Sequence, residues 1–455
     1  MKRVKSSLEK TIQAAALAAL FVLPAALLAC GEGRLQPAAA VQAGTAQEKL
    51  PKKKLMKDKW FDIELTGDYY MDTRLMFMLS TVWNRTADFG EVVDTAARLR
   101  PSSELSWYNE WRVTAERVSA MGDASLERGH LVSAGEAYLR AGNYYLASEV
   151  FLHTDPSDPR ILETYKKGQD YFMKGNKLLG TPVEVVRIPY EGKYLRGYFY
   201  RSPLVKGRGP VVILHQGFDA PVEATTQVPD AALKRGFHCL LLEGPGQGLS
   251  IRELGIPFRP DWEKPISKAV DYLLTRPDVD PARLALVGTS MGGGFAARAL
   301  AYERRLKAGV LNPGYHNLYR LVNDVLDTRI INLYEEDPKE FNNKMSDLTR
   351  YSIVLRWGIN HGMWVFGAGT PADFISTMKK YDFTADIPKI TARVLVMDGE
   401  DEEYGKGQAR EVYDLLTCPK TYLFFPTEEF ASLHCQSGAN SVGTARMFDW
   451  LEENL

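Results

Sequence analysis

The chain has 455 residues, of which 45% are hydrophobic and 25% are charged, and its formal net charge is −1. This length suits two domains better than one, and the composition is that of an ordinary globular protein. A net charge so close to zero gives no reason to expect a nucleic-acid partner.

The N-terminus has the layout of a bacterial signal sequence. A basic region, Lys2–Lys10, precedes an uncharged apolar run, Ala14–Ala29, which is short for a membrane span. The run ends in Leu27-Leu28-Ala29-Cys30, which resembles a lipobox whose cysteine is lipidated and becomes the first mature residue. Residues 1–30 are therefore interpreted as a lipoprotein signal peptide, so that a lipid on Cys30 anchors the exported protein to a membrane. The alternative is cleavage near Ala38-Ala39-Ala40, which gives a soluble secreted or periplasmic protein.

Residues 31–59 are rich in Ala, Gln, Gly and Lys without apolar periodicity, which is typical of a disordered tether. Residues 60–180 show helical spacing and predict an all-helical N-terminal cap domain. Gly142-Asn143 is expected to be a turn between two of its helices. The predicted helices are Arg74–Val82, Phe89–Leu99, Trp107–Met121, Ser125–Ala141, Tyr144–Leu152 and Arg160–Leu178.

Strands begin after Thr181. A hairpin around Glu191-Gly192-Lys193 is followed by alternating strands and helices, which predict an α/β domain over residues 181–455 with a mostly parallel, doubly wound sheet. About eighty helical residues, 312–390, separate two of the strands. An insertion at this point covers the carboxyl ends of the strands, where ligands bind, and it is interpreted as a lid.

The strongest functional pattern lies in Arg283–Arg298. A short apolar strand, Leu284–Val287, leads into Gly288-Thr289-Ser290-Met291-Gly292 and then into an Ala-rich helix. A strand, a G-x-S-x-G turn and a helix are the context of a nucleophile elbow, in which the glycines let strand and helix approach closely. The serine stands at a helix N-terminus, which favours developing negative charge. Ser290 is the predicted nucleophile.

A serine hydroxyl needs a neighbouring base to act as a nucleophile. His316, His361 and His434 are the histidines that follow Ser290, and the first two fall in the lid. The order nucleophile, acid, histidine along the chain favours His434, which follows the last predicted strand. His434 is therefore the predicted base.

The acid is expected in the loop Asp398–Glu403, which holds five carboxylates after a predicted strand. Either Asp or Glu can hold the imidazole in the required tautomer. Three residues beyond Gly399 lies Glu402, and this spacing makes it the predicted acid. Asp401 is the alternative, although it would point to the other side if the loop starts extended.

An oxyanion hole needs two N–H groups aimed at the reacting oxygen. One is expected from Met291 and the other from Phe218, because Gly217 lets the chain turn the next N–H inward. The sequence contains no Cys/His metal pattern, and neither a metal nor a cofactor is expected. Gly244–Gly248 lacks the Lys-Ser/Thr of a phosphate loop and is interpreted as a tight turn.

From about Trp60 to the C-terminus the chain resembles α/β-hydrolases of the group that includes 2,6-dihydroxypseudooxynicotine hydrolase and the FrsA-like esterases. The resemblance implies an α/β-hydrolase fold that follows a helical cap domain in the chain. It also implies a hydrolase that uses a Ser–acid–His triad and no cofactor. The chain departs from the group at Glu243, where relatives often have Asp, and at Gly405-Lys406-Gly407, where they often have Pro-Gly. The matching stretches are Gly129–Tyr145, His215–Asp219, Glu243–Gly248, Gly288–Gly293, Leu416–Phe425 and His434–Gln436.

The predicted function is an exported serine hydrolase that cleaves an ester or amide of a small or medium organic molecule through an acyl-enzyme. One alternative is hydrolysis of a carbon–carbon bond in a diketone-like substrate, although Leu306–Asn323 supplies no carboxylate as the extra acid or base that this chemistry usually needs. Two further alternatives are a peptidase and a non-catalytic binding protein with an inactive hydrolase fold. The substrate and the oligomeric state stay open, a dimer included.

Overall fold

The computed structural model describes residues 59–455. The predicted signal peptide and all but the last residue of the predicted tether lie outside these residues. Residues 65–455 form one compact unit. No helix within residues 59–455 has both the length and the apolar character needed to cross a membrane.

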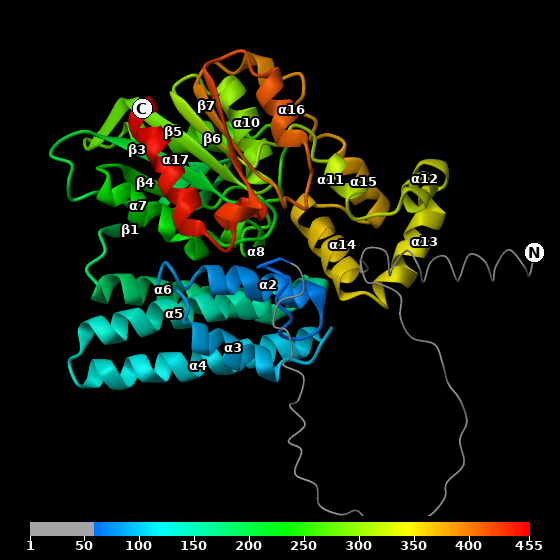
Figure 1. Cartoon of the computed structure of the whole chain (residues 1–455), viewed down its shortest axis with the longest axis horizontal. Helices are drawn as coiled ribbons and strands as arrows, with labels where there is room; N and C mark the ends of the chain where they lie inside the picture. Colours follow the sequence, from blue (N-terminus) through cyan, green and yellow to red (C-terminus); the bar gives the residue numbers. More distant parts are fainter. Residues whose placement is uncertain (1–58) are drawn as a thin grey trace, which may run out of the picture. The chain divides into compact units, whose positions relative to one another are not determined.

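Helices α2 to α6 precede the sheet and form the lower layer in Figure 1. Carboxylate or hydroxyl side chains cap several of them, as Asp68 does for α2 and Asp158 for α6. Aromatic residues fill the space between these helices, and Trp107, Trp111 and Tyr144 are fully buried. The elements are α2 (Tyr69–Ser80), α3 (Phe89–Arg98), α4 (Glu104–Glu127), α5 (Leu131–Glu149), the 3-10 helix η1 (Val150–Thr154) and α6 (Pro159–Leu178).

The turn expected at Gly142-Asn143 is wrong, because α5 continues through both residues. A Cβ on Gly142 would lie 2.9 Å from the carbonyl oxygen of Gly168 in α6, so glycine here allows two helices to pack closely. The Asn143 amide donates a hydrogen bond to the carbonyl of Thr86 at 2.9 Å. The chain turns instead at Gly129, which adopts a φ of 78° between α4 and α5.

Within residues 59–455, eight strands form one sheet in the order β1-β2-β4-β3-β5-β6-β7-β8. β1 pairs with β2 and β2 with β4 in antiparallel fashion, and all other pairs are parallel, which confirms the predicted sheet. β3 and β5 are neighbours, so their carboxyl ends meet. The strands are β1 (Val183–Tyr190), β2 (Lys193–Tyr200), β3 (Gly209–His215), β4 (His238–Leu242), β5 (Val279–Thr289), β6 (Ala308–Asn312), β7 (Arg393–Gly399) and β8 (Lys420–Phe425).

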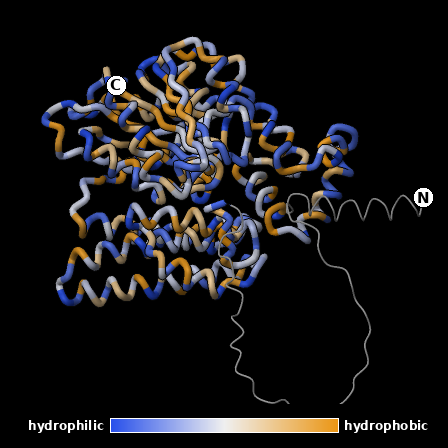
Figure 2. The backbone as a smooth tube through the Cα atoms, in the orientation of Figure 1, coloured by the Kyte–Doolittle hydropathy of each residue, from blue (hydrophilic) through white to orange (hydrophobic). Residues whose placement is uncertain are grey.

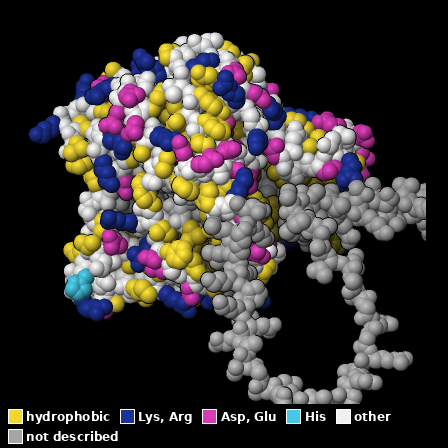
Figure 3. All heavy atoms as spheres, in the orientation of Figure 1, with side chains coloured by type: hydrophobic (Ala, Val, Ile, Leu, Met, Phe, Trp, Pro, Cys, Tyr) yellow, Lys and Arg dark blue, Asp and Glu magenta, His cyan; other side chains and the backbone are white. Residues whose placement is uncertain are grey.

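Helices cover the sheet, and two large buried apolar clusters contain the alternating side chains of the strands. Hydrophobic stretches accordingly follow the strands in Figure 2. On the face shown in Figure 3, basic and acidic side chains are interspersed. These helices are η2 (Val222–Thr225), α7 (Gln227–Lys234), α8 (Gly248–Arg252), α9 (Glu263–Leu274), α10 (Gly292–Tyr302), α16 (Gln408–Leu415), η4 (Thr427–Glu429), η5 (His434–Gln436) and α17 (Asn440–Asn454).

The excursion between β6 and β7 is helical, as expected, and extends to the right of the sheet in Figure 1. Its longest helix, α14, packs against η1 of the N-terminal helices. The elements are α11 (Arg320–Asn323), α12 (Thr328–Glu336), α13 (Pro338–Thr349), α14 (Ile353–Phe366), α15 (Pro371–Met378) and η3 (Ile387–Lys389).

A buried polar network joins α6 to the sheet region. The hydroxyl of Tyr165 donates to Glu223 at 3.2 Å or to Glu243 at 3.1 Å, and the amide of Gln169 reaches the same two carboxylates. Burial, together with the charge of Glu223, raises the pKa of Glu243 to about 8. The N-terminal helices are thus joined to the sheet by hydrogen bonds as well as by apolar contacts.

Candidate active site

Ser290 lies at the sharp turn between β5 and α10. Its φ of 62° is unusual for a residue with a side chain and is typical of a nucleophile elbow. The glycines around it are sterically required: a Cβ on Gly288 would lie 2.0 Å from the carbonyl oxygen of Gly292, and one on Gly293 would lie 1.9 Å from that of Pro313. The strained turn therefore holds the serine at the carboxyl end of β5.

Three of the predicted site residues lie in a hydrogen-bonded line. His434 Nε2 is 2.8 Å from Ser290 Oγ, and His434 Nδ1 is 2.8 Å from both carboxylate oxygens of Glu402. The Glu402 side chain is 4% exposed and the His434 side chain 13% exposed, so the pair is largely shielded from water. The backbone N–H of Tyr404 donates to Glu402 Oε1 at 2.9 Å and holds the carboxylate in place.

The other carboxylates of this loop have different partners. Asp401, the alternative acid, accepts a hydrogen bond from the Thr427 hydroxyl at 2.6 Å. Asp398 accepts one from the Tyr422 hydroxyl at 2.7 Å, and Glu403 accepts one from the Tyr69 hydroxyl at 2.5 Å. Glu402 is thus the member of the loop whose two oxygens face His434.

Residues Gln216–Asp219 follow β3 and are called the β3 loop below. The loop packs against the elbow, because a Cβ on Gly217 would lie 2.6 Å from the backbone nitrogen of Met291. On the other side, Gln247 Nε2 donates to the carbonyl of Gly217 at 3.2 Å and also binds the carbonyl of Gln216. Because the peptide is planar and trans, the N–H of Phe218 points away from Gln247.

Several residues around the site escaped the sequence analysis. Tyr404 packs edge-on against His434, with the ring centroids 5.0 Å apart. Arg74 of α2 binds Asp219 of the β3 loop, and His361 of α14 binds the carbonyl of Phe218. The glycine-rich turn Gly244–Gly248 was the one sequence feature that pointed to this region, because its Gln247 contacts the β3 loop. Arg74 and His361 come from separate helices, and no sequence pattern connected them with the loop.

The two other histidines that follow Ser290 lie apart from this line. His316 is placed between Thr384 and Glu411, at 2.8 Å and 2.7 Å, and His361 packs in α14. Within residues 59–455, His, Cys, Asp and Glu form no cluster that could hold a metal ion.

Comparisons with known proteins identify the family to which this fold belongs. The protein-family model of the alpha/beta hydrolase fold matches residues 209–346 of this sequence. "Hydrolase LUC6" of Fusarium sp. is 33% identical over 405 residues, which cover 85% of this chain and 96% of the relative. The chain belongs to the α/β-hydrolase family. This hydrolase is also 32% identical over 408 residues to "20-hydroxy-prefusarin hydrolase FUS2" of Gibberella moniliformis, covering 85% of this chain and 96% of the relative.

Solved structures share the fold of this α/β-hydrolase. The crystal structure of 2,6-dihydroxy-pseudo-oxynicotine hydrolase superposes with a TM-score of 0.65 at 20% identity, covering 83% of this chain and 95% of that chain. AbyA5 superposes with a TM-score of 0.59 at 14% identity, covering 84% and 95% of the two chains. Both matches extend well beyond the sheet, so the likeness includes much of the helical part as well. The resemblance drawn from the sequence is confirmed.

Proposed function

We propose that this enzyme is a serine hydrolase that cleaves an ester of a small or medium organic molecule through an acyl-enzyme. The observation that carries the proposal is the line from Ser290 Oγ through His434 to Glu402, with both hydrogen bonds at 2.8 Å. A nucleophile bound to a base that is itself oriented by a carboxylate is the arrangement that acyl transfer needs.

In the proposed mechanism Ser290 Oγ attacks the ester carbonyl carbon while His434 Nε2 takes the hydroxyl proton of Ser290. The carbonyl oxygen becomes an oxyanion, which the N–H groups of Phe218 and Met291 bind. When the intermediate collapses, His434 returns the proton to the leaving alkoxide, and Ser290 keeps the acyl group. Water then repeats the sequence with His434 as base, releasing the acid and free Ser290. Glu402 keeps the Nδ1 hydrogen of His434 in place and stabilises the imidazolium.

The test is covalent labelling with a fluorophosphonate, followed by mass spectrometry of the labelled peptide and by an ester panel of varied acyl chain length. We expect one label, on Ser290, and turnover of at least one ester. Matching amides, a peptide and a β-diketone in the same panel separate ester cleavage from the amidase, peptidase and carbon–carbon hydrolase alternatives. A protein that takes up no label and hydrolyses none of the compounds would contradict the proposal and favour a binding role.

The pH dependence follows from His434. Burial alone would lower its pKa, but the Cys435 sulfur and the Glu402 carboxylate outweigh burial and hold the pKa well above 6.5. His434 accepts the serine proton only when it is neutral, so kcat/KM should fall as pH drops through this raised pKa. A profile of kcat/KM against pH measures the midpoint, and Glu402→Gln should move it to lower pH. A wild-type profile that is flat from about pH 6 to about pH 9 would contradict this assignment.

We further propose that the protein is exported as a lipoprotein, on the evidence of the apolar run and of Cys30 at its end. Cys30→Ser removes the thiol to which the lipid is attached, so the variant should move from the membrane fraction to the soluble fraction. Fractionation and the mass of the mature chain measure this. A wild-type protein that is already soluble and begins near Val41 would contradict lipidation and favour ordinary cleavage.

A further inference from the structure

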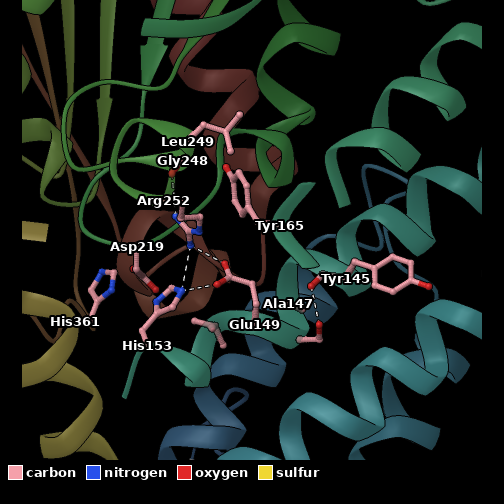
Figure 4. A network of polar contacts seen from close by, with 12 residues as sticks. Tyr145, Ala147, Glu149, His153, Tyr165, Asp219, Gly248, Leu249, Arg252 and His361 are labelled. Atoms are coloured by element: carbon pink, nitrogen blue, oxygen red, sulfur yellow. Dashed lines mark hydrogen bonds and ion pairs between the residues drawn. The ribbon is translucent and has the colours of Figure 1, made fainter. Parts of the chain in front are cut away.

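The β3 loop is bound from outside the sheet by two side chains that belong to different helices. Arg74 Nη1 of α2 donates to Asp219 Oδ2 at 2.5 Å, and His361 Nε2 of α14 lies 3.1 Å from the carbonyl oxygen of Phe218. Figure 4 shows Asp219 and His361 close together. His361 thus contacts Phe218, whose N–H is the proposed oxyanion donor, and Arg74 contacts Asp219, the residue that follows it.

Arg74 is held in one place by several partners. Its Nη2 donates to the hydroxyl of Tyr70 at 2.9 Å, and the side chains of Arg74 and Asp219 are only 16% and 18% exposed. Burial alone would raise the pKa of Asp219, but the guanidinium of Arg74 outweighs it and keeps this pKa below its ordinary value. Asp219 is therefore ionised at neutral pH, and the contact is a shielded ion pair.

His361 binds the loop through a single tautomer. A carbonyl oxygen only accepts hydrogen bonds, so Nε2 of His361 carries the hydrogen and donates it to Phe218. Burial, together with the neighbouring His153, lowers the pKa of His361 well below 6.5, so the ring is neutral and its buried Nδ1 bears no hydrogen. The ring therefore offers the loop one N–H, and its orientation decides where that N–H points.

Trp357 joins the two contacts. The guanidinium of Arg74 lies 4.7 Å from the centroid of the Trp357 ring, and the His361 ring stacks on the same indole at 5.0 Å. His361 also stacks on His153 at 4.8 Å, and His153 is bound to Glu149 of α5 (Figure 4). A shift of α2 or α14 would therefore disturb both contacts with the loop.

We propose that Arg74 and His361 are positioning residues for the oxyanion hole, so that helices outside the sheet take part in catalysis. The inference rests on the proposed function, because it concerns where the N–H of Phe218 points. An oxyanion donor is effective only at about 2.7–3.1 Å from the reacting oxygen, so a loop that loses its outer contacts loses rate rather than substrate affinity.

The test compares a trifluoromethyl ketone with the methyl ketone of the same skeleton. Ser290 Oγ adds to the activated carbonyl carbon, its proton passes to His434 Nε2, and the ketone oxygen becomes an oxyanion in the hole. Because the substrate, inhibitors and Ser290–His434 pair stay the same in every variant, a change in the ratio of the two inhibition constants between variants reports how well the oxyanion of the adduct is stabilised. Arg74→Met should lower both this ratio and kcat for the ester by about 10²-fold, with KM changed only a few-fold.

A second variant separates positioning from stability. Arg74→Met alone leaves Asp219 buried without its partner, which lowers Tm as well. Arg74→Met/Asp219→Asn removes both charges, so Tm should recover while kcat and the ketone ratio stay low. Arg98→Met is the control, because it breaks an ion pair with Glu110 inside the N-terminal helices and should leave the ratio unchanged.

His361 offers a matched pair of substitutions. His361→Gln keeps an N–H near the place of Nε2 and should retain most of the ketone ratio, whereas His361→Leu removes the donor and should lose it. Arg74→Met and His361→Leu variants with a wild-type ratio would overturn the inference. So would a double variant at Arg74 and Asp219 in which activity returns together with Tm. If the wild type takes no fluorophosphonate and does not prefer the trifluoromethyl ketone, the proposed function fails and this inference with it.

Discussion

Replacing Ser290 by alanine should abolish fluorophosphonate labelling and lower kcat by about 10⁶-fold, the loss found when a triad nucleophile is removed. The reason is that a methyl side chain offers no oxygen to His434 Nε2, which lies 2.8 Å from Ser290 Oγ. The variant should still fold, because serine and alanine both carry a Cβ and meet the same strain at a φ of 62°. Labelling and steady-state kinetics on the purified chain measure both effects.

Ser148→Ala is a suitable control for this variant. Ser148 is a fully buried serine in α5 that donates to the carbonyl of Tyr145 at 2.7 Å, away from the elbow. Its loss should change neither labelling nor kcat. If Ser290→Ala keeps the label, another residue is the nucleophile and the proposed function is wrong.

The parts of the fold that were predicted from the sequence are those that local rules determine. Around Ser290, a strand, a glycine-flanked turn and a small-residue helix follow one another within about twenty residues, and β5 and α10 lie where these signals put them. The alternation of strands and helices likewise indicated the parallel sheet. In these segments local propensity and the final packing favour the same structure.

The incorrect turn at Gly142-Asn143 shows where local rules fail. Gly and Asn favour turns in isolation, but Gly142 is small so that α5 can approach α6, and the Asn143 amide satisfies the carbonyl of Thr86. Both reasons depend on segments distant in the sequence. A single sequence carries no pattern that separates a glycine in a turn from a glycine between helices.

The same limit applies to the candidate site. The order of Ser290, the acidic loop and His434 follows the chain order of the fold and could be inferred, because each residue follows a strand. Arg74 and His361 reach the β3 loop from helices whose docking no periodicity reveals. The residues that surround a site from other elements therefore become visible only once the elements are packed together.

Replacing Glu402 by glutamine should lower kcat by about 10³–10⁴-fold. Among the predicted site residues, the acid was the one that sequence spacing determined least well, because several carboxylates share its loop. Both oxygens of Glu402 face His434 Nδ1 at 2.8 Å. An amide there places an N–H against Nδ1, which favours the tautomer with its hydrogen on Nε2. That tautomer offers Ser290 a donor where the reaction needs an acceptor. Steady-state kinetics on a good ester measure the loss.

Asp401→Asn is the matched comparison in the same loop and should change kcat little. Asp401 accepts a hydrogen bond from the Thr427 hydroxyl at 2.6 Å, and the oxygen of an asparagine amide can accept the same bond. The two substitutions exchange a carboxylate for an amide one residue apart, so each removes one negative charge from the same loop. A large loss in Asp401→Asn with little loss in Glu402→Gln would move the acid to Asp401. It would also mean that the loop rearranges when substrate binds, since Asp401 faces Thr427 in the free enzyme.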